Sequence, residues 1–253
     1  MKIMVVNTKG GASKSTFSFQ VLGAYFLDKG IDAELVELDD ENKDSDIFKD
    51  SEISTSTAFV GQSRDDVAHT LQERFKEANK SFIFDIGGNK TTTLVLEALK
   101  RTRLYHLVDC FLIPMSGGSQ DFINAKNTYE IVKNFEKPII FGLSRVRDLN
   151  QMRFQYMEFF REFPNAEYIF LTDSNVIDLS RMLKKSVYEI AKDTIAGGLL
   201  KDYDQLIAKE YKGGEMSEKG NELAYIVRIL EDSVEYQKNI LTPCFEKLDR
   251  VLR

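Results

Sequence analysis

The sequence predicts a three-layer, doubly wound α/β fold with a mainly parallel sheet. Short apolar runs alternate with longer amphipathic segments along most of the 253 residues. This alternation is typical of strands joined by helical crossovers. Glycine-rich or acidic stretches follow directly after several of the apolar runs. In doubly wound folds ligands bind at the carboxyl ends of the strands, so the sequence places its polar candidates where a site is expected.

Composition indicates an ordinary globular chain, with 43% hydrophobic and 29% charged residues. The net charge of −6 argues against a surface coated with basic residues for nucleic acid, although it leaves room for a local patch. Cys110 and Cys244 fit no disulfide or zinc spacing. No leader is visible ahead of the first apolar run, and no run approaches the length of a membrane span. We therefore expect a cytoplasmic protein.

The first apolar run, residues 3–6, leads into the loop Thr8–Thr16 and then into an amphipathic segment that opens at Ser15. A strand, a glycine-rich turn and a helix start are the layout of a phosphate-binding loop, because converging backbone N–H groups and the helix N-terminus attract phosphate. Lys14 would contact the β- and γ-phosphates, and the Ser15 hydroxyl would bind Mg²⁺. We expect the nucleotide to contact Lys9, Gly10, Gly11, Ala12, Ser13, Lys14, Ser15 and Thr16.

This loop departs from the general P-loop pattern, because Thr8 and Ser13 stand where the pattern has glycine. Lys9 precedes the glycine pair, and this makes the loop resemble the deviant Walker A loop of the ParA/MinD family of ATPases. The resemblance implies that Lys9 reaches the nucleotide of a partner subunit and takes part in catalysis together with Lys14. A positive φ at Ser13 would cost on the order of 1 kcal/mol.

The second predicted strand, residues 33–38, follows a helix that ends near Gly30 and runs into an acidic stretch. Glu37-Leu38-Asp39 aligns with an Asp-x-Asp motif of the family, and the resemblance implies that Asp39 is the catalytic residue that positions the attacking water. Asp40 is the alternative. The plainer interpretation of this stretch is a solvated acidic loop.

A third strand is predicted over residues 81–85, after a loop over residues 51–63 and a helix over residues 64–79. It ends in Asp85 and a glycine pair that begins at Gly87. A carboxylate at a buried strand end can hold the magnesium water shell, and glycine lets the backbone pass close to the γ-phosphate. We therefore expect Asp85 at the metal and Gly87 at the nucleotide.

Two further strands are predicted over residues 107–115 and 137–143. By the same resemblance, Asp121 in the polar stretch after the first of them matches a position that can pair with the signature lysine. Ser144 and Arg145 stand where many relatives have Asn-Arg, whose asparagine reads the adenine edge. We expect Ser144 to make part of that contact.

The resemblance covers residues 1 to about 191. We expect a P-loop ATPase domain over residues 1–192 and a helical C-terminal extension over residues 193–253, packed on the same domain. Before the boundary, a helix over residues 151–163 carries many aromatic residues, which either join the core or form a groove for a partner.

The resemblance implies a ParA-like ATPase that forms a homodimer with ATP and Mg²⁺ and hydrolyses ATP to ADP and phosphate slowly, under stimulation by a partner. Such proteins act in plasmid or DNA partition or position cellular cargo. The expected partners are an adaptor or centromere-binding protein and, as a weaker expectation, nonspecific DNA; we do not expect a membrane partner. A cluster of basic residues near the end of the domain fits DNA phosphates or an ordinary solvated face: Arg181, Lys184, Lys185 and Lys192.

Two other functions remain open. One is a nucleotide-dependent switch in conjugation or cell-pole organisation that acts through protein partners without binding DNA. The other is a metabolic enzyme built on the same loop, for which the sequence shows no substrate pocket.

Overall fold

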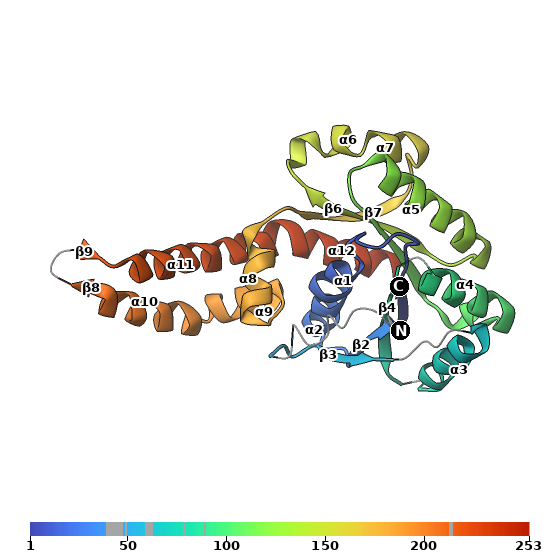
Figure 1. Cartoon of the computed structure of the whole chain (residues 1–253), viewed down its shortest axis with the longest axis horizontal. Helices are drawn as coiled ribbons and strands as arrows, with labels where there is room; N and C mark the ends of the chain where they lie inside the picture. The colour runs from blue at the N-terminus through green and yellow to red at the C-terminus, as the bar shows by residue number, and fades with distance from the viewer. Residues whose placement is uncertain are drawn as a thin grey trace. The chain divides into compact units, whose positions relative to one another are not determined.

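A computed structural model describes residues 1–38, 48, 50–58, 63–77, 79–88, 90–212 and 215–252 (Figure 1). The chain forms two compact units. The first consists of Met1–Asp46, Glu52–Asp173 and Cys244–Arg253, and the second of Ile47–Ser51 and Ser174–Pro243.

The first unit is built on a seven-stranded sheet with the order β3-β2-β4-β1-β5-β6-β7, in which every described pair of neighbours is parallel. The strands are β1 Lys2–Val5, β2 Ala33–Leu38, β3 Ser54–Thr57, β4 Ser81–Ile86, β5 Cys110–Met115, β6 Ile139–Val146 and β7 Glu167–Thr172. The chain leaves β1 towards β2 on one side and later crosses from β4 to β5 on the other. The carboxyl end of β1 therefore lies at the point where the strand order reverses, and the predicted doubly wound fold is confirmed.

Strand β3 corrects one prediction, because residues 51–63 were expected to form a loop throughout. Its sequence is Ser-Thr-Ser-Thr, and its side chains are exposed or half-buried. The strand lies at the edge of the sheet and, among the described residues, pairs only with β2. An edge strand can be held by backbone hydrogen bonds along one side, so it needs no apolar run that periodicity would reveal.

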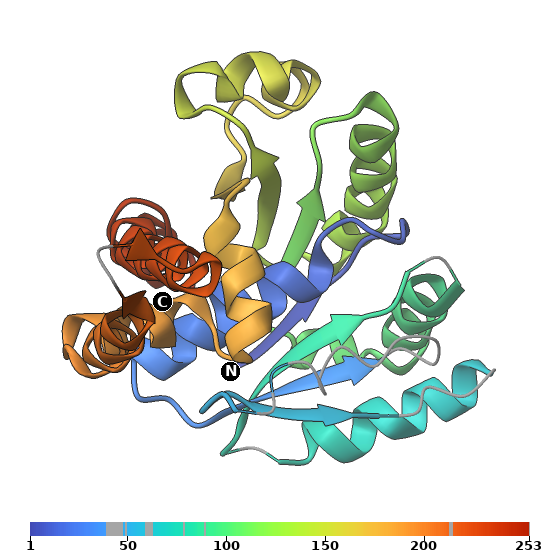
Figure 2. The same cartoon turned by 60° about the vertical axis from the view of Figure 1, so that its left-hand side comes forward.

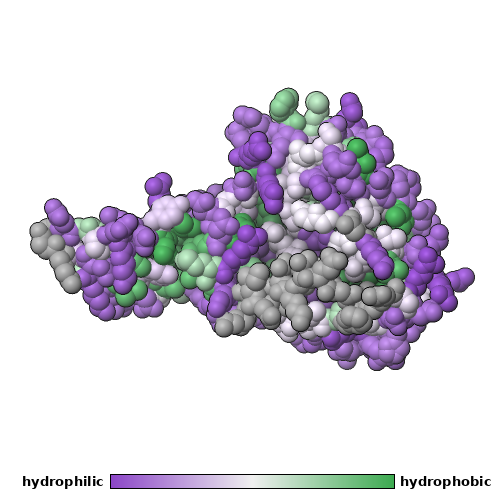
Figure 3. Space-filling model, in the orientation of Figure 1, coloured by the Kyte–Doolittle hydropathy of each residue, from purple (hydrophilic) through white to green (hydrophobic). Residues whose placement is uncertain are grey.

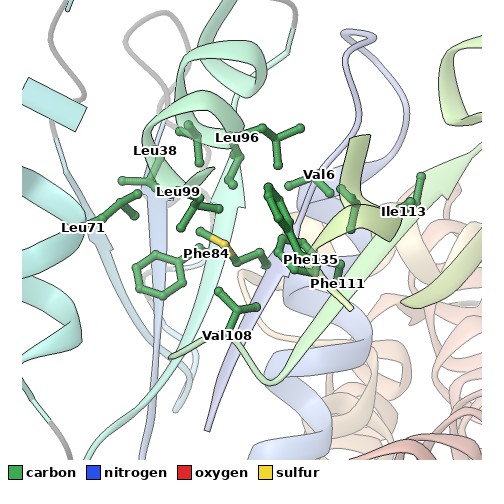
Figure 4. Close-up of a cluster of buried hydrophobic side chains, with 14 of the residues drawn as sticks. Val6, Leu38, Leu71, Phe84, Leu96, Leu99, Val108, Phe111, Ile113 and Phe135 are labelled. Atoms are coloured by element: carbon green, nitrogen blue, oxygen red, sulfur yellow. The ribbon is translucent and has the colours of Figure 1, made fainter. Parts of the chain in front are cut away.

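One face of the sheet is covered by α3 Arg64–Phe75, α4 Lys90–Thr102, α5 Ser119–Val132 and α7 Met157–Glu162. Figure 2 shows α3, α4 and α5 along this side of the strands. Buried side chains of these helices form one cluster with every second residue of the central strands (Figure 4). Phe84, Phe111 and Phe141 are its aromatic members on three strands. The short elements on this side are η3 Leu104–Leu107, η4 Lys133–Phe135, η5 Leu149–Gln151 and α6 Met152–Gln155.

The opposite face is covered by one continuous helix, made of α1 Lys14–Phe17, the π-helical segment η1 Ser18–Gly23 and α2 Ala24–Asp28. Phe17 is fully buried, and a Cβ atom on Gly142 of β6 would lie 2.9 Å from its ring. Glycine at that position lets the phenyl ring rest directly on the strand. The helix that begins at the phosphate loop is therefore fixed to the sheet within its first turn.

The last helix, α12 Thr242–Val251, also belongs to the first unit. The hydroxyl of Tyr25 on α2 donates to Asp249 at 2.9 Å, and Lys247 pairs with Glu167 of β7 at 2.5 Å. The Cys244 thiol donates to the backbone oxygen of Phe170. The end of the chain thus packs between α2 and β7.

The second unit is helical, with a short antiparallel pair of strands. Its elements are α8 Asn175–Leu183, α9 Val187–Ile195, α10 Gly198–Glu210, β8 Tyr211–Lys212, β9 Glu215–Met216, α11 Glu218–Tyr236 and η6 Gln237–Leu241. Among the described residues of 198–228, Gly220 alone is buried. The predicted boundary after residue 192 falls inside α9, and the division into an ATPase domain and an extension stays a prediction. Across the described part of the chain, no helix has both the length and the apolar character to cross a membrane.

Candidate functional site

Three neighbouring strands end side by side next to the predicted phosphate loop. In the register of the sheet, Val5 at the end of β1 pairs with Asp85 of β4, and Asp85 pairs with Glu37 of β2. Both carboxylate residues are only 5% exposed. The predicted phosphate loop leaves β1 a few residues after Val5, so the two carboxylates and the loop share one edge of the sheet. Asp39 and Asp40 lie outside the described residues.

The loop itself has a left-handed backbone at two positions. Gly11 has φ 72° and Ser13 has φ 64°. Glycine adopts this conformation without cost, but for serine it costs roughly 1–2 kcal/mol. A Cβ atom on Gly10 or Gly11 would meet no atom within 4 Å. The space beside the two glycines is open, as a loop that wraps a phosphate requires.

The two lysines of the loop have different surroundings. Lys14 is the first residue of α1, is 8% exposed, and donates from its amino group to the backbone oxygen of Lys9 at 3.2 Å. The Lys9 side chain is 39% exposed and forms an ion pair with Asp121 of α5. One ammonium group is therefore folded over the loop, and the other lies at its rim beside a carboxylate of the same chain.

The turn after β4 touches the phosphate loop directly. A Cβ atom on Gly88 would lie 2.9 Å from both the Cα and the backbone nitrogen of Gly10. The backbone nitrogen of Gly87 donates to Leu38 at the end of β2, at 2.9 Å. Only glycine permits so close an approach between the two backbones. A shift of the turn after β4 must therefore displace the backbone of the loop at Gly10.

The loop is also held by buried polar residues that the sequence did not single out. Asn7 accepts a hydrogen bond from the backbone nitrogen of Lys9 at 2.8 Å and donates to the backbone oxygen of Pro114 at 2.6 Å. Thr92 of α4 donates to the backbone oxygen of Asn7 at 3.1 Å, and Thr128 of α5 accepts from the backbone nitrogen of Thr8 at 3.2 Å. Asn7 could have been identified from the sequence, because it is the first polar residue after an apolar strand. Nothing in the local sequence distinguishes the two threonines.

Ser144 lies at the carboxyl end of β6 and contacts the phosphate loop. It is 2% exposed, and its hydroxyl accepts from the Ser13 hydroxyl at 3.0 Å. The Tyr156 hydroxyl donates to the backbone oxygen of Ser144. Burial raises the pKa of Tyr156, and the charge of Asp121 adds to the effect, so this hydroxyl stays protonated. The next residue, Arg145, has φ 57° and an exposed side chain. Contact of Ser144 and Arg145 with a nucleotide base stays a prediction.

The chemistry of the remaining residues suits a nucleotide bound with magnesium. Ser15, in the first turn of α1, and Asp85 offer a hydroxyl and a carboxylate, which are the oxygen ligands that Mg²⁺ takes alongside phosphate oxygens. Of the candidate residues, the structure brings these to one end of the sheet: Lys9, Gly10, Gly11, Ala12, Ser13, Lys14, Ser15, Thr16, Asp85, Gly87, Asp121 and Ser144.

No family model matches the sequence, and no curated protein sequence matches it. Solved structures do match the fold. A chain of the MinC:MinD cell division protein complex of Aquifex aeolicus superposes with a TM-score of 0.56 at 12% identity, over 74% of this chain and 87% of that chain. A ParA family ATPase of Chlorobium tepidum TLS gives 0.54 at 16% identity, over 76% of this chain and 92% of that chain.

A third structure is a putative plasmid partition protein of Borrelia burgdorferi B31 bound to AMPPNP, with a TM-score of 0.51 at 11% identity over 72% of this chain and 88% of that chain. The fold is that of a P-loop ATPase. Within this class it is the fold of the MinD and ParA proteins.

Proposed function

We propose that this chain is a ParA/MinD-type ATPase that binds ATP with Mg²⁺ at the loop Lys9–Thr16. The observation that carries the proposal is the meeting of this loop with the end of β4, where Asp85 pairs with Val5 and Gly88 abuts Gly10. A phosphate loop and a carboxylate at a neighbouring strand end are the two parts that P-loop ATPases need. A structural neighbour bound to AMPPNP supports the proposal.

In this proposal each residue has a defined task. Lys14 and the first turn of α1 neutralise the phosphates, and Ser15 and Asp85 hold the magnesium ion and its water shell. The metal ion, when bound, offsets negative charge on the phosphates. Asp39 positions the attacking water, a role that rests on the resemblance alone. Phosphoryl transfer needs positioning and charge compensation more than a strong base, which suits this set of side chains.

We further propose that ATP drives formation of a homodimer in which Lys9 reaches the partner subunit's nucleotide. The Lys9 side chain is half-exposed and ends at the rim of the loop, paired with Asp121. A lysine in this position is available to a second subunit once the pair opens. ATP would then favour the dimer by adding contacts that only the dimer makes, and hydrolysis would release it.

The cellular role proposed is plasmid or DNA partition, or the positioning of cargo, with slow hydrolysis stimulated by an adaptor protein. One structural neighbour is a chain of a MinC:MinD complex and another is a putative plasmid partition protein, which supports a role that depends on a protein partner.

The substitution Lys14→Ala tests the proposal. We expect wild-type protein to bind ATP in the presence of magnesium, and the variant to bind at least about tenfold more weakly because a charge-assisted contact with phosphate is lost. Lys126→Ala is the matched control, since Lys126 pairs with Glu162 at the surface and lies outside the loop. Equal ATP affinity of the Lys14→Ala variant and the control would contradict the proposal.

A second candidate is a nucleotide-dependent switch that acts through proteins and binds no DNA. Two members of the basic cluster are paired with acids within the second unit: Arg181 with Asp178 at 3.4 Å and Lys185 with Asp193 at 2.8 Å. These pairs, together with the net charge of −6, weaken the cluster as a site for DNA phosphates.

An exposed hydrophobic surface for a partner protein supports the second candidate. Phe154 is 80% exposed and Met157 is 55% exposed. Figure 3 shows hydrophobic side chains at the surface in the region of α6 and α7. Both residues line a pocket of roughly 190 Å³, whose lining also includes Ser116 and Gly117 from the turn after β5. A partner bound here would contact the turn that leads to Asp121.

The ATPase rate with and without duplex DNA separates the two candidates. Stimulation by DNA, together with retention of the ATP-bound protein on DNA until the salt concentration is raised, supports partition. ATP-dependent dimerisation without DNA retention supports the switch.

A further inference from the structure

Two of the positions at which the sequence departs from the family pattern are in direct contact. Ser13 replaces a glycine of the loop, and Ser144 replaces the asparagine at the end of β6. They are 131 residues apart in the chain, yet the Ser13 hydroxyl donates to the Ser144 hydroxyl at 3.0 Å. Because the two residues interact, we take the two departures from the family pattern to be linked.

The Ser144 hydroxyl uses its full hydrogen-bonding capacity. It donates to the backbone oxygen of Met115 at 3.2 Å, accepts from Ser13, and lies 3.3 Å from the Ser116 hydroxyl. Because its one proton goes to Met115, Ser116 must be the donor in the third bond. Ser144 is 2% exposed, so these partners hold it in place and leave its hydroxyl no bond for the nucleotide base that the sequence predicts it to contact.

The direction of the Ser13 hydroxyl matters because Ser13 is the residue before α1. A serine in this position ordinarily accepts a hydrogen bond from a backbone N–H of the first turn of the helix. Ser13 makes no such bond: its backbone is left-handed rather than extended as in a capping residue, and its hydroxyl points to Ser144. The first-turn N–H groups are the ones that a bound phosphate would need. A hydroxyl that capped the helix would compete with the phosphate for them.

We infer that Ser144 is a positioning residue for the phosphate loop. It holds the Ser13 hydroxyl away from the N-terminus of α1 and secures the left-handed backbone at Ser13, which has φ 64°. The inference rests on the proposed function, because it concerns how the loop receives the phosphates of ATP. We call the hydrogen bond between Ser13 and Ser144 the brace. Glycine at position 13 would need no brace, since it has no hydroxyl and no cost at positive φ.

A double-mutant cycle tests the brace by ATP affinity. Ser144→Ala should weaken ATP binding about fivefold, the value of one ordinary hydrogen bond. In an S13G background the same change should leave the affinity within about twofold, because the hydroxyl to be restrained is gone. The unsatisfied oxygen of Met115 is common to both backgrounds and cancels in the cycle.

Ser116→Ala is the control, since it removes a neighbouring hydroxyl bond and keeps that between Ser13 and Ser144. We expect it to bind ATP as the wild type does. An equal loss of affinity on Ser144→Ala in both backgrounds, or a loss on Ser116→Ala as large as on Ser144→Ala, would overturn the inference.

Amide hydrogen exchange without nucleotide separates failure of the brace from failure of the proposed function. Exchange at residues 10–13 should be faster in the S144A variant than in the wild type, while adding S144A to S13G should change nothing. If the wild type binds no ATP, the proposed function fails. The exchange data then still decide on the brace, and equal exchange in the wild type and the S144A variant refutes it.

Discussion

The amino group of Lys9 is paired with the carboxylate of Asp121 in the same chain. The lysine belongs to the predicted phosphate loop, which precedes β5 in the sequence. The aspartate belongs to the first turn of α5, which follows β5. Because both side chains belong to one subunit, this contact must open before Lys9 can serve a second subunit.

Lys9→Ala should keep ATP binding within a few-fold of wild type and lose dimerisation with ATP, because Lys14 remains over the loop. Light scattering of protein with saturating ATP and magnesium measures the dimer, and Lys126→Ala is the control. A Lys9→Ala variant that dimerises with ATP as well as wild type would refute the role across the subunit interface while leaving the phosphate loop itself intact.

Asp121→Asn should make dimerisation easier. The amide no longer holds the ammonium group, and a partly exposed pair is worth about 1 kcal/mol. Both pairs of a homodimer must open, so the dimer dissociation constant should be about 30-fold lower. Sedimentation at a series of protein concentrations in ATP measures this constant. A weaker dimer would mean that Asp121 supports Lys9 in the dimer as well.

Gly88→Ala should impair the site, because the new methyl group would lie 2.9 Å from backbone atoms of Gly10. The two turns must separate, at a cost of about 1–3 kcal/mol. We expect a lower melting temperature and an ATP affinity at least about tenfold weaker. Gly198→Ala, where a Cβ atom meets nothing within 4 Å, is the control and should lower neither. Normal ATP binding by Gly88→Ala would show that the contact is dispensable.

Glu34 of β2 should make stability depend on acid pH. Burial raises the pKa of Glu34, but hydrogen bonds from Lys80 and Ser56 outweigh it, so the pKa lies below its ordinary value. The Lys80 bond is 2.6 Å long. A carboxylate with a lowered pKa stabilises the fold fully above its unfolded pKa, about 4.3, and loses this contribution as the pH falls through the lower folded value.

Glu34→Gln should therefore be less stable than wild type at pH 6, by about 1 kcal/mol, and the difference should shrink towards pH 3. Urea unfolding of both proteins at the two pH values measures it. A difference that does not change with pH would exclude this ion pair as its source.

Two phenylalanines of neighbouring helices should respond differently to truncation. Phe159 of α7 is 1% exposed and Phe154 of α6 is 80% exposed. Phe159→Ala should cost about 3–5 kcal/mol of unfolding free energy, because it leaves a cavity in the core. Phe154→Ala should change stability by less than about 0.5 kcal/mol. Thermal unfolding checks both, and a large loss on Phe154→Ala would show that this side chain is buried in solution.

In the aromatic segment over residues 151–163, periodicity predicts a helix but not its break or which side chains are buried. The segment was predicted as one helix, but the structure has α6 and α7 with a break at Tyr156, which is buried. Tyr156 turns inward to donate its hydroxyl to Ser144. The core interpretation holds for Phe159, whereas Phe154 is exposed and a groove for a partner stays a prediction. The packing of the segment against β6 decided that Phe159 is buried and Phe154 is exposed.

By itself the sequence determined the doubly wound fold and most strands of its sheet, and it predicted a phosphate loop and site residues at the strand ends. These features depend on local patterns, namely apolar runs, glycine pairs and charged residues placed directly after strands. It also identified Ser13 and Ser144 as departures from the family pattern. It could not show that they touch, and it missed Thr92 and Thr128, because their partners lie far away in the chain. It missed β3 because an edge strand needs no apolar run.

What the tertiary structure decided is how distant segments meet at one edge of the sheet. The register of β1, β4 and β2 set Val5, Asp85 and Glu37 in a row, and the crossover to β6 carried Ser144 to the phosphate loop. A hydrogen bond between residues 131 positions apart leaves no periodic trace in the sequence. It exists only because parallel strands gather their carboxyl ends on one side of the sheet.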